Sequence, residues 1–201
     1  ILGPDAKRYC ELVRNVEALA KGAGDDPEDV FAGLQVLQLE DHHGFGHAVG
    51  RALNLVRTDF VLVVQHDQEL VRGFDLPAVL RAMAAYPEEV KYVGLASATT
   101  VPYERIVRSK FGIEIAPTTE FGVPLMPLIF FYDKPHICSR KYYQDVVLGP
   151  ESPVKRGDFI EETFGKAQRA EILDQGMQAH RRYGTYQLHD RGPDGEAMVH
   201  V

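Results

Sequence analysis

The stretch HGFGHAVGRALNLVRTDFVLVVQHDQE, residues 43 to 69, decides the fold of this chain. Its first part is rich in glycine and then spaces apolar side chains as in a helix with one buried face. The run Phe60 to Val64 is continuous and rich in valine, which is typical of a strand covered on both faces of a sheet. Five polar residues, Gln65 to Glu69, follow it directly. The pattern predicts a helix and then a buried strand that ends in a polar loop.

Helix and strand patterns alternate along the rest of the chain. Residues 5–21 carry a helical stripe of apolar side chains, and Asp75 can cap a second helix that has Pro77 near its first turn. This alternation predicts an α/β fold, with a mostly parallel sheet and helices on both faces. With 201 residues, the chain is expected to form a single domain over residues 1–201. Further strands are predicted at Val36–Leu39, Tyr92–Ala96, Leu128–Tyr132 and the stretch TYQLH that ends at His189.

The composition argues against several classes of partner. The 22 basic and 29 acidic side chains give a net charge of −7, so no basic excess is present to bind nucleic acid. No apolar run reaches the ~20 residues of a membrane span. The two cysteines, Cys10 and Cys138, are too few for a disulfide framework, and they do not have the spacing of a metal site. A reducing compartment, and therefore a cytoplasmic location, is the expectation.

The polar residues after Val64 have two interpretations. In α/β sheets, ligands bind beyond the carboxyl ends of the strands, so Gln65 to Glu69 would line a site. A loop in contact with water is polar for that reason alone. The pattern by itself favours neither interpretation.

Several motifs, taken in order, resemble the family-2-like glycosyltransferases of the GT-A fold. ILGPD at 1–5, VLQLEDHHGFGHAVG at 36–50 and FVLVVQHD at 60–67 resemble that family's first turn, glycine-rich helix and metal-binding Asp-x-Asp strand. KRGDFIEETFG at 155–165 resembles the family's acidic segment. YGTYQLHDRG at 183–192 resembles a late strand whose histidine often completes the metal site. The resemblance implies a GT-A-like domain that transfers a sugar from a nucleotide donor.

The sequence departs from the family pattern in three places. Gln65 stands where the first acid of Asp-x-Asp is usual, and the usual asparagine of the glycine-rich helix falls near Gly50. The family's first strand and helix have no counterpart before Ile1, so we expect the chain to be an N-terminally truncated fragment of a longer protein. Loss of one carboxylate is expected to weaken metal binding without abolishing it.

The resemblance also implies roles for particular residues. Asp67 and His189 would hold Mn²⁺ or Mg²⁺, which offsets the charge on a departing diphosphate. Glu162 takes the position of the family's general base, and its neighbour Glu161 is the next candidate. The implied donor-binding residues are Asp5, Gly44, Gly46, Gln65 and Arg191.

Each of these residues also has a purely structural interpretation. Asp67 can be a helix cap or a solvated loop acid, and His189 can simply form a hydrogen bond at a strand end. Glu161 and Glu162 precede a helical pattern, where acids stabilise the helix dipole without doing chemistry.

The predicted function is an inverting, metal-dependent glycosyltransferase. Its expected partners are a UDP- or GDP-sugar donor and a hydroxyl acceptor on a glycan or a protein. Two alternatives from other classes stay open. One is a non-catalytic module of the same fold that binds a sugar nucleotide or a glycan, which Gln65 favours. The other is a nucleotidyltransferase, which uses a related sheet and metal.

Overall fold

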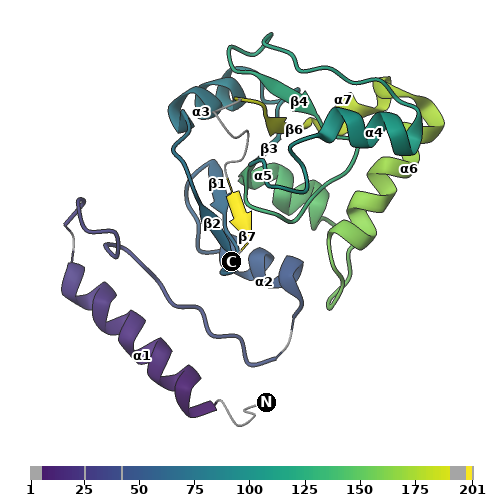
Figure 1. Cartoon of the computed structure of the whole chain (residues 1–201). Helices are drawn as coiled ribbons and strands as arrows, with labels where there is room; N and C mark the ends of the chain where they lie inside the picture. Colours follow the sequence, from purple (N-terminus) through teal and green to yellow (C-terminus); the bar gives the residue numbers. More distant parts are fainter. Residues whose placement is uncertain (1–5, 25, 42, 191–197, 201) are drawn as a thin grey trace. The chain divides into compact units, whose positions relative to one another are not determined.

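The computed structural model describes residues 6–24, 26–41, 43–190 and 198–200. The chain divides into two compact units, Ile1–His43 and Gly44–Val201 (Figure 1). The expectation of one domain over residues 1–201 stays a prediction. Among the helices in these described ranges, none combines the length and the apolar character needed to cross a lipid bilayer.

The described residues of the first unit form one helix, α1 (Ala6–Ala23), close to the helix predicted over residues 5–21. Its stripe of apolar side chains is largely exposed within the unit, with Val13 the buried exception. The strand predicted at Val36–Leu39 is wrong, because residues 34–39 have no regular structure. An isolated strand is not stable without a partner, and no described strand pairs with these residues.

A five-stranded sheet forms the centre of the second unit, in the order β1-β5-β3-β6-β4 (Figure 1). The α/β class is therefore confirmed. The expectation of a mostly parallel sheet is wrong, because only β3 and β6 pair in parallel and the other three pairings are antiparallel. The cause is that β5 runs opposite to its two neighbours, β1 and β3, and that β4 runs opposite to its neighbour β6. The strands are β1 (Phe60–Val63), β3 (Tyr92–Gly94), β4 (Leu125–Pro127), β5 (His136–Ser139) and β6 (Thr185–Leu188).

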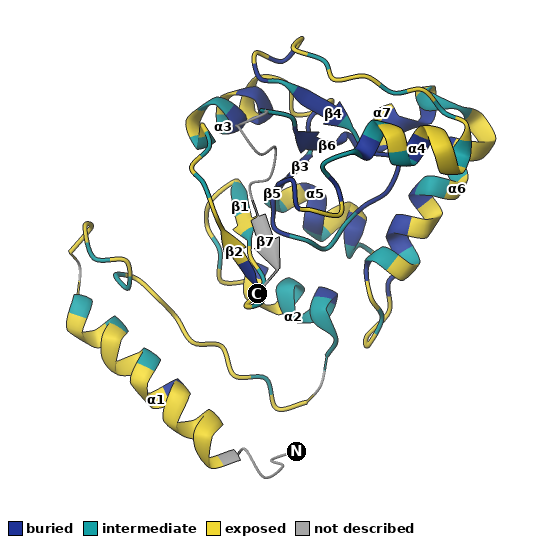
Figure 2. Cartoon of the chain, viewed as in Figure 1, coloured by how far each residue is buried: buried dark blue, intermediate teal, exposed yellow. Residues whose placement is uncertain are grey.

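Helices cover both faces of this sheet, as predicted. Helix α3 (Leu76–Ala85) packs on the face that carries Phe60, and Asp75 caps it by accepting a hydrogen bond from the backbone N–H of Ala78 at 2.9 Å. The face that carries Tyr92 is covered by the other helices, and Figure 2 shows the buried residues between them. These elements are α2 (Phe45–Leu53), α4 (Tyr103–Phe111), α5 (Arg140–Tyr142), η1 (Tyr143–Val147), η2 (Glu161–Gly165), α6 (Lys166–Gln175), η3 (Met177–Ala179) and α7 (His180–Tyr183).

The strand predicted at Leu128–Tyr132 is also wrong, although this segment lies in the core. The N–H of Leu128 still donates to the carbonyl of Thr185 in β6 at 2.9 Å, but side chains supply the next bonds of the segment. The carbonyl of Leu128 accepts hydrogen bonds from Gln168 Nε2 at 2.9 Å and Thr185 Oγ1 at 3.0 Å. The N–H of Ile129 donates to the hydroxyl of Tyr103 at 3.1 Å. The buried backbone is thus satisfied without a regular strand.

A small second sheet connects two loops of this unit. Strand β2 (Gln68–Leu70) pairs antiparallel with β7 (Met198–His200). Nearby, Arg72 forms an ion pair with Asp190 at 2.8 Å, in which the guanidinium donates to the carboxylate. The chain after β1 is therefore held beside the chain after β6.

Candidate functional site

Three strands of the main sheet run in the same direction and end at one edge, which we name the carboxyl edge. Strands β1 and β3 are both antiparallel to β5, and β6 is parallel to β3. The carboxyl ends of β1, β3 and β6 therefore lie at the same edge as the start of β5. Ligand sites in α/β sheets form at such an edge. The polar segments that meet it are Gln65–Asp67, Ser97–Thr100, Asp133–Lys134 and His189–Asp190.

A pair of carboxyl groups stands at the carboxyl edge. Oε1 of Glu161, the first residue of η2, accepts a hydrogen bond from the backbone N–H of Asp133 at 3.1 Å. Partial burial, together with the charge and hydrogen bond of the Asp133 carboxyl, raises the pKa of Glu161 to about 7, while Lys134 acts in the opposite direction. A carboxyl group with a pKa near neutrality is suited to general acid–base catalysis.

An ammonium group is fixed beside this pair by two hydroxyl groups. Nζ of Lys134 donates to Oγ1 of Thr99 at 2.6 Å and to Oγ of Ser97 at 3.3 Å. The Thr100 hydroxyl closes the same turn by accepting from the N–H of Ser97 at 3.0 Å. Gln187 of β6 donates to the carbonyl of Thr100 at 3.2 Å and anchors the turn to the sheet. The site thus combines two carboxyl groups, one cation and two hydroxyls.

Glu162, which the family motif singles out, has different surroundings. Its side chain is 59% exposed and forms an ion pair with Lys166, four residues further along. Glu161 is partly buried and contacts Asp133 instead. Of the two adjacent acids, Glu161 is therefore the one whose carboxyl group contacts the backbone of Asp133.

The geometry of η2 explains why the side chain of Glu161 faces Asp133. The turn is π-helical, because the N–H of Gly165 donates to the carbonyl of Ile160 at 3.0 Å, five residues back. A Cβ on Gly165 would lie 2.6 Å from the carbonyl oxygen of Phe131, so glycine permits the close approach. Ile160 is fully buried and fixes the start of the turn. Single π-helical turns are frequent at functional sites.

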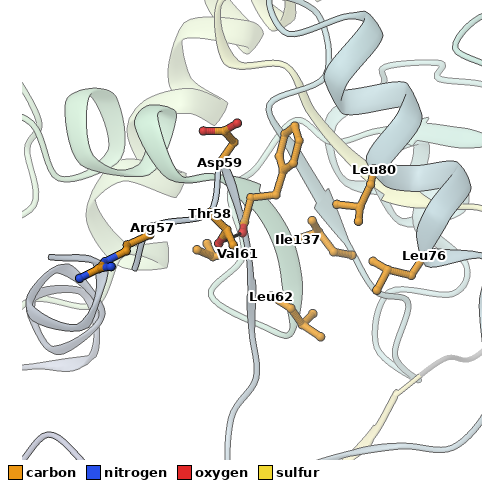
Figure 3. A pocket seen from close by; sticks show the side chains of 9 residues that line it. Arg57, Thr58, Asp59, Val61, Leu62, Leu76, Leu80 and Ile137 are labelled. Atoms are coloured by element: carbon orange, nitrogen blue, oxygen red, sulfur yellow. Dashed lines mark hydrogen bonds between the residues drawn. The ribbon is translucent and has the colours of Figure 1, made fainter. Parts of the chain in front are cut away.

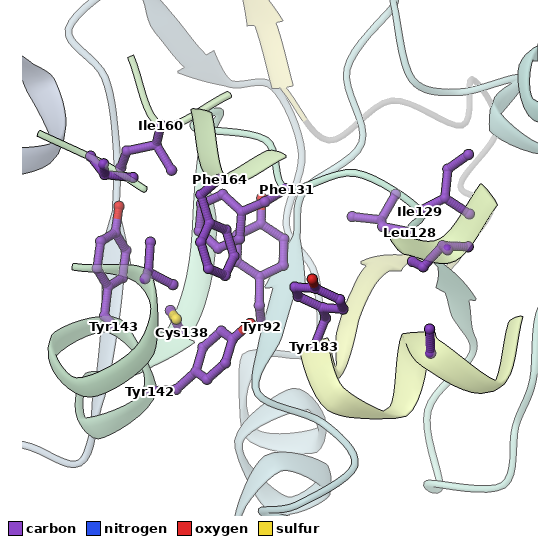
Figure 4. Packing of buried hydrophobic residues seen from close by; sticks show 14 of the residues in the cluster. Tyr92, Leu128, Ile129, Phe131, Cys138, Tyr142, Tyr143, Ile160, Phe164 and Tyr183 are labelled. Carbon is purple, nitrogen blue, oxygen red and sulfur yellow. The ribbon is translucent and has the colours of Figure 1, made fainter. Parts of the chain in front are cut away.

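A buried cluster rich in aromatic side chains, among them Tyr92, Phe131 and Tyr143, packs in the core (Figure 4). The hydroxyl of Tyr92 donates to the carbonyl of Tyr132 at 2.9 Å. The ring of His136 stacks between Tyr92, at 4.6 Å between centroids, and Tyr143, at 5.7 Å. Burial lowers the pKa of His136 to about 4, although a hydrogen bond to the Lys134 carbonyl opposes this shift. A neutral histidine and its neighbours thus hold the loop backbone in place.

Gly44 and Gly46 begin helix α2 and pack against the loop that leads into η2. A Cβ on Gly44 would lie 2.9 Å from the Cα of Gly157, and one on Gly46 would lie 2.8 Å from Cγ1 of Ile160. The predicted donor-binding glycines therefore lie against the chain that leads to Glu161. Their binding of a donor stays a prediction.

Gly44→Ala is expected to destabilise the protein. Gly44 has φ 75° and ψ 159°, a combination almost restricted to glycine, and its backbone strain alone costs about 1–3 kcal/mol in another residue. The contact with Gly157 adds to this cost. Gly73→Ala is the control, because nothing lies within 4 Å of its Cβ position. Urea unfolding measures both variants, and equal stabilities would contradict the role assigned to Gly44.

Asp67 and His189 both follow strands that end at the carboxyl edge, but their strands are not neighbours. Strands β5 and β3 lie between β1 and β6. The distance between β1 and β6 is therefore three strand spacings, or roughly 14 Å. Contact between the two side chains therefore depends on the loops that β2, β7 and the Arg72–Asp190 ion pair hold together. A cation shared by Asp67 and His189 stays a prediction.

The segment after β1 offers few ligands for a divalent cation. Asp67 supplies a carboxylate between two amides, Gln65 and Gln68, and the Oε1 atom of Gln68 is buried without a hydrogen bond. In the described part of the chain, no three His, Cys, Asp or Glu side chains form a group that could hold a metal ion. Mg²⁺ is commonly bound by one or two carboxylates together with phosphates and water.

Asp5 and Arg191, two of the predicted donor-binding residues, lie outside the described residues. A separate groove of about 540 Å³ lies between β1 and α3 (Figure 3). Its walls include Leu62, Leu76 and Leu80, so it is mainly apolar and lacks the carboxyl pair of the carboxyl edge.

The sequence analysis missed Ser97 and Thr99 as members of the site. A signal for both was present, since the hydroxyl-rich run SATT directly follows a predicted strand. Comparison of the chain with protein-family models, with curated proteins and with solved structures finds no match.

Proposed function

We propose that the carboxyl edge transfers a sugar from a nucleoside-diphosphate donor to a hydroxyl acceptor, with inversion at the anomeric carbon. The observation that carries this proposal is the partly buried carboxyl of Glu161, whose pKa is raised to about 7 beside the ends of the strands. An inverting transfer needs a base of this kind at the acceptor hydroxyl. The order of motifs that resembles the family-2-like glycosyltransferases, and with it a GT-A-like fold, supports the same conclusion.

In the proposed reaction, Glu161 accepts the proton of the acceptor hydroxyl. The hydroxyl oxygen forms its bond to the anomeric carbon on the face opposite the diphosphate. The bond from that carbon to the diphosphate breaks, and its electron pair leaves with the diphosphate. A bound divalent cation, for which Asp67 is the proposed carboxylate ligand, would offset the charge on the leaving group. The charge of the Lys134 ammonium group acts against the rise in the pKa of Glu161.

A second candidate is a non-catalytic module that binds a sugar nucleotide. Gln65 in place of an acid, and the lack of a three-ligand metal group among the described side chains, favour this alternative. Such a module would bind the donor and release no nucleoside diphosphate from it.

Binding of a nucleoside diphosphate with Mn²⁺ or Mg²⁺ is expected to raise the melting temperature. A ligand at 100 times its Kd stabilises the native state by about 2.7 kcal/mol, which corresponds to roughly 5–10 °C for a protein of this size. Asp67→Asn is expected to remove the metal-dependent part of the shift. Asp59→Asn, at the other end of β1, is the matched control. No shift with UDP or GDP, alone or with either metal, would contradict both candidates.

A further inference from the structure

The ammonium group of Lys134 is held by hydroxyl groups and not by carboxylates. Its Nζ donates to Oγ1 of Thr99 at 2.6 Å and to Oγ of Ser97 at 3.3 Å. Among the described residues it forms no ion pair, although Asp133 precedes it in the chain and Glu161 bonds to the backbone of Asp133. Hydroxyl groups are neutral, so direct contact with a carboxylate does not offset the charge of this lysine.

The same cluster has hydrogen-bond donors left for a ligand. An ammonium group has three N–H donors, and Lys134 uses two of them on the hydroxyls. The hydroxyl of Thr99 accepts from the lysine and keeps its own O–H, which can reach a ligand because Thr99 is exposed. A phosphate group accepts several such bonds, and lysine binds it as a point charge.

The turn that carries these hydroxyls is fixed by the sheet. Ser97 and Thr100 are buried, and the N–H of Thr100 donates to the carbonyl of Ser97 at 2.7 Å. The side chain of Gln187 in β6 donates to the carbonyl of Thr100 at 3.2 Å. The hydroxyls and the lysine are therefore placed before any ligand binds, which lowers the entropic cost of binding.

The position of Lys134 beside the proposed base indicates which substrate it contacts. Asp133, the residue before it, donates its backbone N–H to Oε1 of Glu161 at 3.1 Å. In an inverting transfer the base contacts the attacking hydroxyl, and the leaving group departs from the opposite face of the sugar. A cation next to Glu161 is therefore on the side of the acceptor and not on the side of the diphosphate.

We propose that Lys134 and Thr99 bind a phosphate group of the acceptor, so that the acceptor is a phosphate ester with a free hydroxyl. This inference rests on the proposed function and names its acceptor class. No bond to phosphorus forms or breaks, because the phosphate only orients the acceptor so that its hydroxyl meets Glu161. The carboxyl groups of Asp133 and Glu161 repel an anion, so binding depends strongly on the lysine.

Inorganic phosphate is the probe for this site. A metal-free NMR titration of the full chain follows the backbone amides of Ala98 and Thr99. The parent is expected to bind phosphate, and Lys134→Gln to weaken the affinity by roughly 10–100-fold, the usual loss for a hydrogen bond to a charged group. Lys141→Gln removes the same charge at an exposed site and is the matched control. No binding by the parent, or equal losses in the two lysine variants, would overturn the inference.

Thr99→Val keeps the test decisive if Lys134→Gln does not fold. It removes one hydroxyl from an exposed residue and is expected to weaken phosphate binding by roughly 2–10-fold, as for a neutral hydrogen bond. An affinity equal to that of the parent would contradict the proposed contact.

Two further titrations identify the source of the bound group. Addition of UDP or GDP is expected to leave phosphate bound, and its displacement by either would assign Lys134 to the donor and overturn the inference. Acetate is expected to bind more weakly than phosphate, and tighter binding of acetate would rule out a phosphate ester. The phosphate titration contains neither donor nor sugar, so a failure of the transfer reaction would not change its result.

Discussion

Glu161→Gln is expected to reduce turnover by about 10²–10⁴-fold, the usual contribution of a positioned general base. Glutamine keeps the size of the side chain and can still accept the hydrogen bond from the backbone N–H of Asp133. It cannot take the proton of the hydroxyl. Donor binding should therefore persist while transfer fails. The measurement is release of the nucleoside diphosphate from a nucleotide-sugar. The nucleotide of that sugar donor is the one, UDP or GDP, that gives the thermal shift.

Glu162→Gln is the matched control for this experiment. Its carboxylate is exposed and paired with Lys166, so its loss is expected to change turnover by less than about threefold, in keeping with the small contribution of exposed ion pairs. If Glu162→Gln were the more damaging change, the base would be the residue that the family motif indicates. If both variants kept full turnover, neither acid would be the base. A parent protein that binds the donor without turnover would indicate the non-catalytic module.

The stability of the protein is expected to depend steeply on pH because of His136. Its pKa falls from an ordinary value of 6.5 to about 4 in the folded state, where the ring is fully buried. Between these values the unfolded chain binds a proton that the folded protein does not bind, so stability is lost as the pH falls from about 6.5 to about 4. The shift corresponds to about 3 kcal/mol. Urea unfolding between pH 4 and pH 7.5 measures this loss.

His136→Phe is expected to remove most of that pH dependence. Phenylalanine keeps a ring between Tyr92 and Tyr143 but has no titrating nitrogen. Glu161 acts in the opposite direction, because its raised pKa makes the folded state bind more protons below about 7. That contribution is present in both proteins and cancels in their difference. His66→Gln, at an exposed histidine, is the control. Equal slopes for the parent and His136→Phe would show that another group controls acid unfolding.

The parts of the fold that can be predicted from the sequence are those fixed by nearby residues. The helical spacing before Val56 and the run from Phe60 identify α2 and β1 without knowledge of their neighbours. The segment Leu128–Tyr132 has an equally strong apolar pattern, but the carbonyl of Leu128 and the N–H of Ile129 bond to side chains of distant residues. Val36–Leu39 has the pattern of a strand and no strand to pair with in the described residues. Pairing partners are not visible in a local pattern.

The positions of Asp67 and His189 after strand ends could be predicted from the sequence, whereas the surroundings of Glu161 could not. The rule that ligands bind beyond strand ends gives the position of Asp67 and His189. The choice between Glu161 and Glu162 depends on how η2 is rotated. Adjacent residues of an α-helix point about 100° apart. The turn η2 is π-helical and holds more residues per turn, so the angle between adjacent side chains differs from that value. The partnership of Glu161 with Asp133 comes from residues 28 positions apart, which no spacing rule connects.

The common direction of β1, β3 and β6 also leaves an opposite edge that has no part in the proposed chemistry. The turn before β3 lies there, and the side chain of Glu88 in that turn is 86% exposed. Glu88→Cys offers an attachment point for a surface or a dye, once the exposed Cys10 is changed to serine and the buried Cys138 is left in place. A molecule tethered in this way would present Glu161 and its neighbours to the solution, away from the support. The polarity of the sheet thus makes oriented immobilisation of this chain possible.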